Sequence, residues 1–113
     1  RKSLNGSKVL LLGLAYKRGT SDWRESPSVV VAERFAASGA EVEFCDPHIP
    51  EVNARHARFP LVEFAPKRLA AADVVVVLVD HTEFDPAVIA EHSALVFDAK
   101  NIMRGTGFAG EIL

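Results

Sequence analysis

Residues 9–27 read VLLLGLAYKRGTSDWRESP and decide the fold of the chain. The apolar run 9–12 breaks at Gly13, a polar loop follows, and Ser26 then precedes Pro27 and a long apolar helix pattern. Strand, turn, polar loop and helix in this order open a βαβ unit. Polar groups therefore follow the carboxyl end of a first parallel strand, which is the edge where open α/β sheets bind ligands.

The rest of the chain repeats this alternation. Strand patterns cover 8–12, 41–44, 73–79 and 94–97, with a short edge strand at 61–63. The tail after Arg104 forms either a short last strand or an irregular end. Helix patterns run from Pro27 to just before Gly39, over 66–72, and from Asp85 and Pro86 to His92, whereas 49–58 is irregular or weakly helical. The run 74–79 is apolar on both faces, as a central parallel strand under two helical layers must be. We predict an α/β fold, a Rossmann-like three-layer sandwich with a mostly parallel sheet and right-handed crossovers, in a single domain over residues 1–113.

Composition and charge exclude several classes of protein. The chain has 113 residues, of which 49% are hydrophobic and 25% charged, as in an ordinary globular domain. A formal net charge of −2 gives no electrostatic basis for a nucleic-acid or membrane partner. No apolar run has the roughly 18–20 residues of a membrane span, and no signal peptide is recognisable. Cys45 is the only cysteine, so we expect no disulfide and a cytoplasmic location.

Polar residues gather at one edge of the predicted sheet. Those that follow strands are Tyr16, Lys17, Asp46, Asp80, His81, Asp98 and Lys100. Lys17, Arg24 and Lys100 are cationic, and cations beside the backbone amides of a helix start suit a phosphate or diphosphate.

A complete dinucleotide-binding fingerprint is not present. The pattern G-x-G-x-x-G needs a second glycine where the chain has Ala15. Asp46 follows Gly13 by about thirty residues, whereas a ribose-binding acid is expected after about twenty. The site therefore depends on side chains, Lys17 above all, and on a different ligand or a different binding mode.

At these residues the chain resembles a known family. GLAYK at 13–17, followed by D-x-R-E-S-P at 22–27, is similar to the C-terminal, UDP-binding domain of the UDP-glucose/GDP-mannose dehydrogenases. The similarity spans roughly residues 8–103 and includes DPH at 46–48, the entry to the valine run at 72–73, HTEF at 81–84 and DAKN at 98–101. It implies a full-length NAD-dependent UDP-sugar 6-dehydrogenase of polysaccharide biosynthesis, which oxidises the C6 hydroxyl to a carboxylate. An N-terminal domain would bind NAD, a central region would form a homodimer or larger assembly, and this chain would be a fragment that binds the UDP-sugar.

The resemblance also implies roles for single residues. Tyr16 and Lys17 match the substrate-binding pair, and Arg24 matches an arginine that reaches the cofactor held by the other domain. Lys100 matches a substrate contact that is often arginine, so the charge is kept but the planar fork is lost. The family's catalytic cysteine has no counterpart, so we expect no catalytic residue in this chain and no activity from it alone. Which sugar is bound, and whether the nucleotide is UDP or GDP, stays open.

Several polar residues have simpler interpretations. We expect Cys45 to be a buried apolar side chain, and His48, His56, His81 and His92 to bind no metal because they lack ligand spacing. His81 is expected to hydrogen-bond within its own loop, and Arg55, Arg58, Lys67 and Arg68 to form a solvated face. Asp22 and Glu25 either serve the site or only pair with Arg24.

The function also has an alternative. A free-standing nucleotide-binding or regulatory module of the same fold would lack any oxidoreductase partner. A cofactor fingerprint and a later cysteine-containing segment upstream of Arg1 would favour the dehydrogenase, and an immediate start codon would favour the module.

Overall fold

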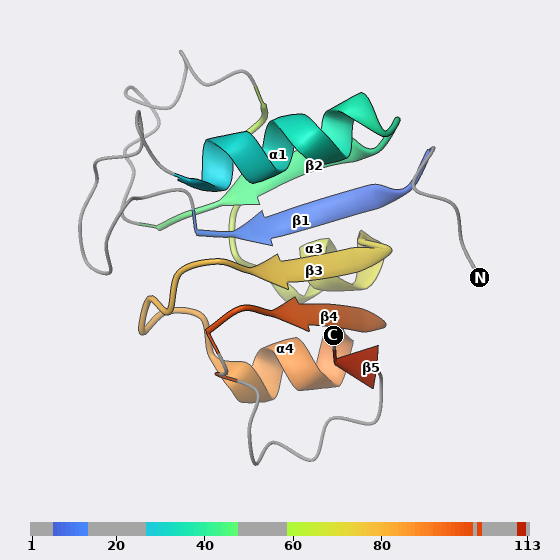
Figure 1. Ribbon diagram of the computed structural model, residues 1–113. Coiled ribbons are helices and arrows are strands. Elements are labelled where there is room, and N and C mark those ends of the chain that lie inside the picture. Colours follow the sequence, from blue (N-terminus) through green and yellow to red (C-terminus); the bar gives the residue numbers. More distant parts are fainter. Residues whose placement is uncertain (1–5, 14–26, 48–58, 101, 103–110, 113) are drawn as a thin grey trace.

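The structure is a computed structural model that describes residues 6–13, 27–47, 59–100, 102 and 111–112. Strands and helices alternate along the chain, as the sequence predicts (Figure 1). The elements are β1 (Lys8–Leu12), α1 (Pro27–Ala37), β2 (Glu41–Cys45), α3 (Pro66–Ala71), β3 (Val74–Val77), α4 (Pro86–His92), β4 (Leu95–Asp98) and β5 (Glu111–Ile112). None of the described helices is long and apolar enough to cross a membrane.

The five strands form one sheet in the order β2-β1-β3-β4-β5, and every described pair is parallel. The predicted sheet was mostly parallel, and the described one is wholly so. β3 lies at its centre between β1 and β4, with Leu12 opposite Val77 and Val77 opposite Asp98. This position explains its four consecutive valines, because a central parallel strand buries both faces.

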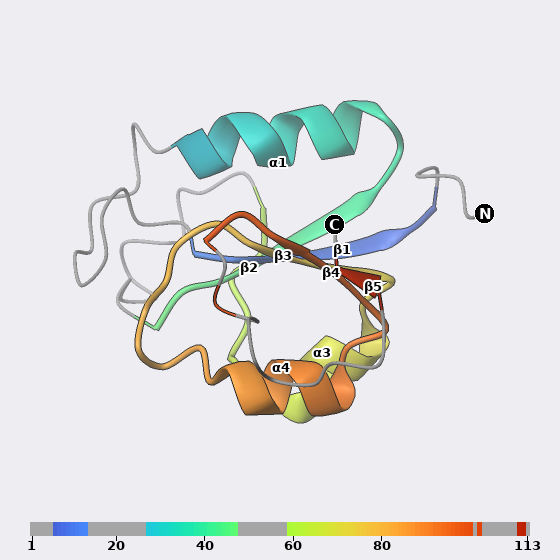
Figure 2. The same ribbon diagram turned by 60° about the horizontal axis from the view of Figure 1, so that its bottom comes forward.

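Helices cover both faces of the sheet and give the predicted three layers. Figure 2 shows α1 on one face and α3 with α4 on the other. Alternate residues of each strand supply the two cores: Val9 and Leu11 of β1 pack on the α1 side, while Leu10 and Leu12 pack on the α3 and α4 side. The two-residue period of the strand therefore serves two hydrophobic layers at once.

Local signals set several element ends. The side chain of Asp85 caps α4 by accepting the N–H of Ala87 at 2.9 Å, and Pro86 occupies the first turn. Gly39, with φ of 91°, follows α1 in the predicted left-handed conformation. Of the two alternatives for the tail, the short last strand is observed as β5, of two residues.

Two predicted strands differ from the observed ones by more than one residue at an end. The proposed strand at 61–63 is reduced to an isolated bridge between Leu61 and Phe44. The proposed strand 73–79 ends at Val77, because the N–H groups of Leu78 and Val79 both donate to the Leu12 carbonyl, at 2.9 and 3.3 Å, and the chain turns. The irregular segment predicted at 49–58 lies outside the described residues.

Candidate functional site

The carboxyl edge of the sheet has a topological switch point between β1 and β3. From β1 the chain passes through α1 to β2 on one side, and the next crossover returns through α3 to β3 on the other. α1 and α3 lie on opposite faces of the sheet, so the two crossovers pass over opposite faces (Figures 1 and 2). Ligands of open α/β sheets bind in the crevice formed at such a point. The candidate site is therefore built on the residues that follow β1 and its neighbours.

Gly13 forms the turn that ends β1. Its N–H donates to the Cys45 carbonyl at 2.9 Å, and its φ is +106°. A Cβ at this position would lie 2.5 Å from Cβ of Val79 and 2.9 Å from its backbone nitrogen. Only glycine fits, because the conformation is unfavourable for other residues and Val79 fills the space a side chain would need. The turn is thus held from the β2 side by Cys45 and from the β3 side by Val79.

A buried acid–imidazole pair lies at the same edge. Asp46, which follows β2, and His81, which follows β3, are joined at 3.1 Å between Oδ2 and Nε2, and both side chains are 0% exposed. An ionised carboxylate only accepts hydrogen bonds, so the imidazole then donates its Nε2–H. The His81 ring also packs on Phe84, with ring centroids 5.4 Å apart.

The Asp46 partner of His81 was not predicted. The sequence placed both residues at this edge, as observed, but assigned His81 a hydrogen bond within its own loop. The signal was available in the topology, because both residues follow strands that flank β1 on either side. It was missed because the two residues are separated by β1 in the sheet and by 35 positions in the chain.

Asp98 shapes the next loop of the same edge. Its Oδ1 accepts the N–H of Lys100 at 3.2 Å and the N–H of Ile102 at 3.1 Å. The neighbouring Ala99 N–H donates to the Val77 carbonyl at 3.1 Å, which ties this loop to β3. Lys100, the one predicted substrate contact that the structure describes, is exposed here, with a cation available to a ligand.

The other predicted site residues, Tyr16, Lys17 and Arg24, lie outside the described residues. The structure describes Gly13, which directly precedes the segment 14–26 that contains these residues. Among the described residues, no group of three or more His, Cys, Asp or Glu side chains is arranged to hold a metal ion.

A cavity of about 590 Å³ opens beside Asp46 at this edge, between the end of β2 and the segments around 61–64 and 83. Cys45 lines it but is only 1% exposed, as expected of a buried apolar side chain. Burial, and then the negative charges of Asp46 and Glu63, raise the pKa of the Cys45 thiol to about 12. The thiolate is the reactive form of cysteine, so this residue is poorly suited to nucleophilic chemistry.

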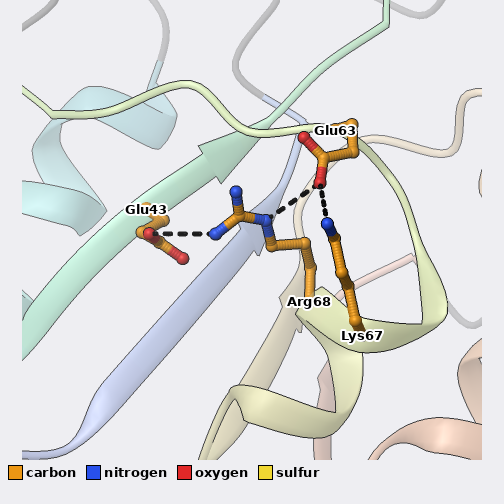
Figure 3. Close-up of polar contacts among 4 residues, drawn as sticks. All are labelled: Glu43, Glu63, Lys67 and Arg68. Atoms are coloured by element: carbon orange, nitrogen blue, oxygen red, sulfur yellow. Dashed lines mark hydrogen bonds and ion pairs between the residues drawn. The ribbon is translucent and has the colours of Figure 1, made fainter.

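A second cavity, of about 370 Å³, lies away from this edge and includes Lys8 and Glu41 at the amino ends of β1 and β2. Glu43 and Arg68 line this cavity and belong to a charged cluster (Figure 3). Arg68 pairs with Glu63 at 3.1 Å and with Glu43 at 3.8 Å, and Lys67 pairs with Glu63 at 3.8 Å. A hydrogen bond at its own backbone N–H, followed by the hydrogen bond from Arg68, lowers the pKa of Glu63. These cations are matched by carboxylates, which makes them a poor phosphate site. Lys67 is solvated as predicted, whereas Arg68 is half-exposed and ion-paired.

Comparison with known proteins gives one consistent family. Residues 10–105 match the UDP binding domain of the UDP-glucose/GDP-mannose dehydrogenase family. A UDP-glucose 6-dehydrogenase of Haloferax volcanii is 36% identical over 109 residues, covering 91% of this chain and 25% of the relative. The UDP-N-acetyl-D-mannosamine dehydrogenase of Escherichia coli is 33% identical over 100 residues, covering 86% of this chain and 24% of its own length.

Solved structures agree with the sequence matches. A UDP-D-ManNAc dehydrogenase from Pyrococcus horikoshii superposes with a TM-score of 0.73 at 27% identity, over 97% of this chain and 26% of that one. A UDP-glucose dehydrogenase from Pyrobaculum islandicum shares the fold with a TM-score of 0.77 at 24% identity, over 98% of this chain and 26% of its own. The chain thus spans about a quarter of the length of the relatives that it matches.

Proposed function

Because the chain belongs to the UDP-glucose/GDP-mannose dehydrogenase family, as its UDP-binding domain, we propose that it binds the UDP-sugar substrate of an NAD-dependent 6-dehydrogenase. That enzyme would oxidise the C6 hydroxyl of the sugar to a carboxylate. The family match over residues 10–105 carries the proposal. The exposed Lys100 and the switch-point geometry support it, since this edge is where such a fold receives a nucleotide.

In this proposal Lys17 and Lys100 hold the diphosphate and Tyr16 completes the substrate contact. A lysine acts on a diphosphate as a compact point charge, so it orients the anion without fixing a plane. The side chains of this domain would therefore supply binding and orientation, and the sugar C6 would be presented to a catalytic group on another part of the enzyme.

The NAD would be held mainly by a separate N-terminal domain, with Arg24 as the contribution of this chain. The sequence supports this division, because the second fingerprint glycine, which lets a backbone approach a pyrophosphate, is replaced by Ala15. Gly13 stands at the first glycine, which serves the tight turn, and Val79 packs against it. When bound, NAD would act as the hydride acceptor, and two NAD would be needed per sugar because oxidation of an alcohol to a carboxylate removes four electrons. We also propose a homodimeric or larger enzyme in the cytoplasm, where the single free Cys45 would remain reduced.

The test is calorimetric titration of UDP-glucose and of UDP-N-acetylhexosamine into the full-length dehydrogenase and its Lys17→Met variant. A charge-assisted hydrogen bond contributes about 1.5–3 kcal/mol, so we expect Kd to rise roughly 10- to 150-fold for the sugar that wild type binds. Lys67→Met is the matched control, because Lys67 is 77% exposed and paired only loosely to Glu63 at 3.8 Å. Its affinity should equal that of wild type.

Circular dichroism of both variants checks the fold. An affinity of folded Lys17→Met within a factor of two of wild type would reject the role of Lys17, and wild type that binds no nucleotide sugar would reject the function. Two further results belong to the same proposal. Arg24→Ala should weaken NAD binding and spare the sugar affinity, and this chain alone should produce no NADH from NAD and UDP-sugar.

A further inference from the structure

The Asp46–His81 pair spans the end of β1, and its neighbours in the chain hold the Gly13 turn. Asp46 directly follows Cys45, whose carbonyl accepts the Gly13 N–H at 2.9 Å. His81 comes two residues after Val79, whose side chain fills the space beside Gly13. Three contacts therefore surround the turn in a closed series, called the ring here. Gly13 is hydrogen-bonded to Cys45, Asp46 is hydrogen-bonded to His81, and Val79 packs against Gly13.

A hydrogen bond constrains this ring in a way that an apolar contact would not. Two buried apolar side chains can slide against each other, whereas the 3.1 Å bond between Oδ2 and Nε2 fixes the separation of the two loops. Both side chains are fully buried, so removal of either one takes a hydrogen bond away from a buried polar group. A buried polar pair adds little net stability over an apolar pair of the same shape, and its effect here is on geometry.

We propose that Asp46 and His81 are positioning residues for substrate binding. They set the Gly13 turn, from which the chain enters residues 14–26 with the proposed substrate contacts Tyr16 and Lys17. The inference rests on the proposed function for its consequence, UDP-sugar affinity, but its first step, control of the turn, concerns described residues alone. The two steps can be measured separately.

The experiment compares His81→Phe with His81→Gln in the full-length dehydrogenase. Phenylalanine keeps a ring against Phe84 but removes both nitrogens, whereas glutamine keeps an N–H near the position of Nε2. The first readout is hydrogen–deuterium exchange of the peptide over residues 9–17 without ligand, since it contains the Gly13 N–H. The second is the Kd for the UDP-sugar, with KM and kcat.

For His81→Phe we expect faster exchange at this peptide. Kd and KM should rise by about 10-fold, because part of the energy of the lost hydrogen bond is coupled to the position of the turn, and kcat should change less than about two-fold. His81→Gln should recover most of both losses. Ile89→Ala is the matched control: Ile89 is 0% exposed on α4 and its truncation costs stability of a similar order without touching the Gly13 turn. It should leave Kd within about two-fold of wild type.

Each outcome decides one of the two steps. Normal exchange at residues 9–17 in folded His81→Phe overturns the positioning role, and so does a loss of affinity no greater than that of Ile89→Ala. Faster exchange in a protein whose wild type binds no UDP-sugar supports control of the turn and rejects the proposed function. If His81→Phe does not fold, Asp46→Asn, which nearly preserves shape, provides the same comparison.

Discussion

The Gly13→Ala substitution should lower the free energy of unfolding, for two reasons that the surroundings of Gly13 show. An added Cβ would lie 2.5 and 2.7 Å from Cβ and Cγ2 of Val79 and 2.9 Å from its backbone nitrogen, at a φ of +106°. A positive φ costs a non-glycine residue about 1–3 kcal/mol, and overpacking adds about 1–3 kcal/mol. Alanine also lowers the conformational entropy of the unfolded chain, which offsets about 0.4–1 kcal/mol of this loss. We expect the free energy of unfolding to fall by about 3 kcal/mol.

Gly6→Ala separates the two contributions. Gly6 also has a positive φ, +81°, but nothing lies within 4 Å of an added Cβ. Its loss should be the backbone cost alone, about 1 kcal/mol. Urea unfolding followed by circular dichroism measures both variants. With a slope of about 2 kcal/mol per molar urea, the Gly13→Ala midpoint should lie about 1 M below that of Gly6→Ala. Midpoints that agree within about 0.25 M would refute the packing argument.

Three further predictions concern single interactions. Asp85→Ala should lower the free energy of unfolding by about 1 kcal/mol because the Ala87 N–H loses its cap, and Asp85→Asn should lose much less, both in thermal melts. Cys45 should resist a thiol reagent at pH 8 until urea unfolds the chain. Because its pKa rises from 9.0 unfolded to about 12 folded, stability should be full below pH 9 and fall as the pH rises toward 12; urea midpoints at pH 8 and 10 that coincide would contradict this. Arg68→Met should lower Tm by no more than about 4 °C, since its ion pairs are partly exposed; a larger drop would show that this cluster is structurally important.

Much of the fold could be predicted because its signals are local. Each of α1, α3 and α4 begins at a proline, and the four consecutive valines of β3 indicate a central strand. Such signals depend on the residue itself and on neighbours a few positions away. The exact strand ends were less predictable. Val79 continues the apolar run and is a β-branched residue typical of strands, but it lies beyond the end of β3 and packs beside Gly13.

The site shows the same division between local and distant causes. The gathering of Asp46, His81, Asp98 and Lys100 at one edge follows from parallel topology, which alternating strands and helices predict. The bond between Asp46 and His81 does not follow from topology, because it depends on the conformation of the residues directly after β2 and β3. Asp98 is similar: its acceptance of two N–H groups in its own loop is a property of the loop conformation.

The isolated bridge at Leu61 has a consequence for the behaviour of the protein at high concentration. β2 is an outer strand, and such a strand can recruit another chain through its free backbone groups. At Phe44 those groups are occupied: its N–H donates to the Pro60 carbonyl at 2.8 Å, and its carbonyl accepts the Val62 N–H at 2.7 Å. The other outer strand, β5, offers only two residues. The segment that includes Pro60 and Leu61 covers the outer edge of β2 at Phe44, so another chain cannot pair with β2 there without displacing it.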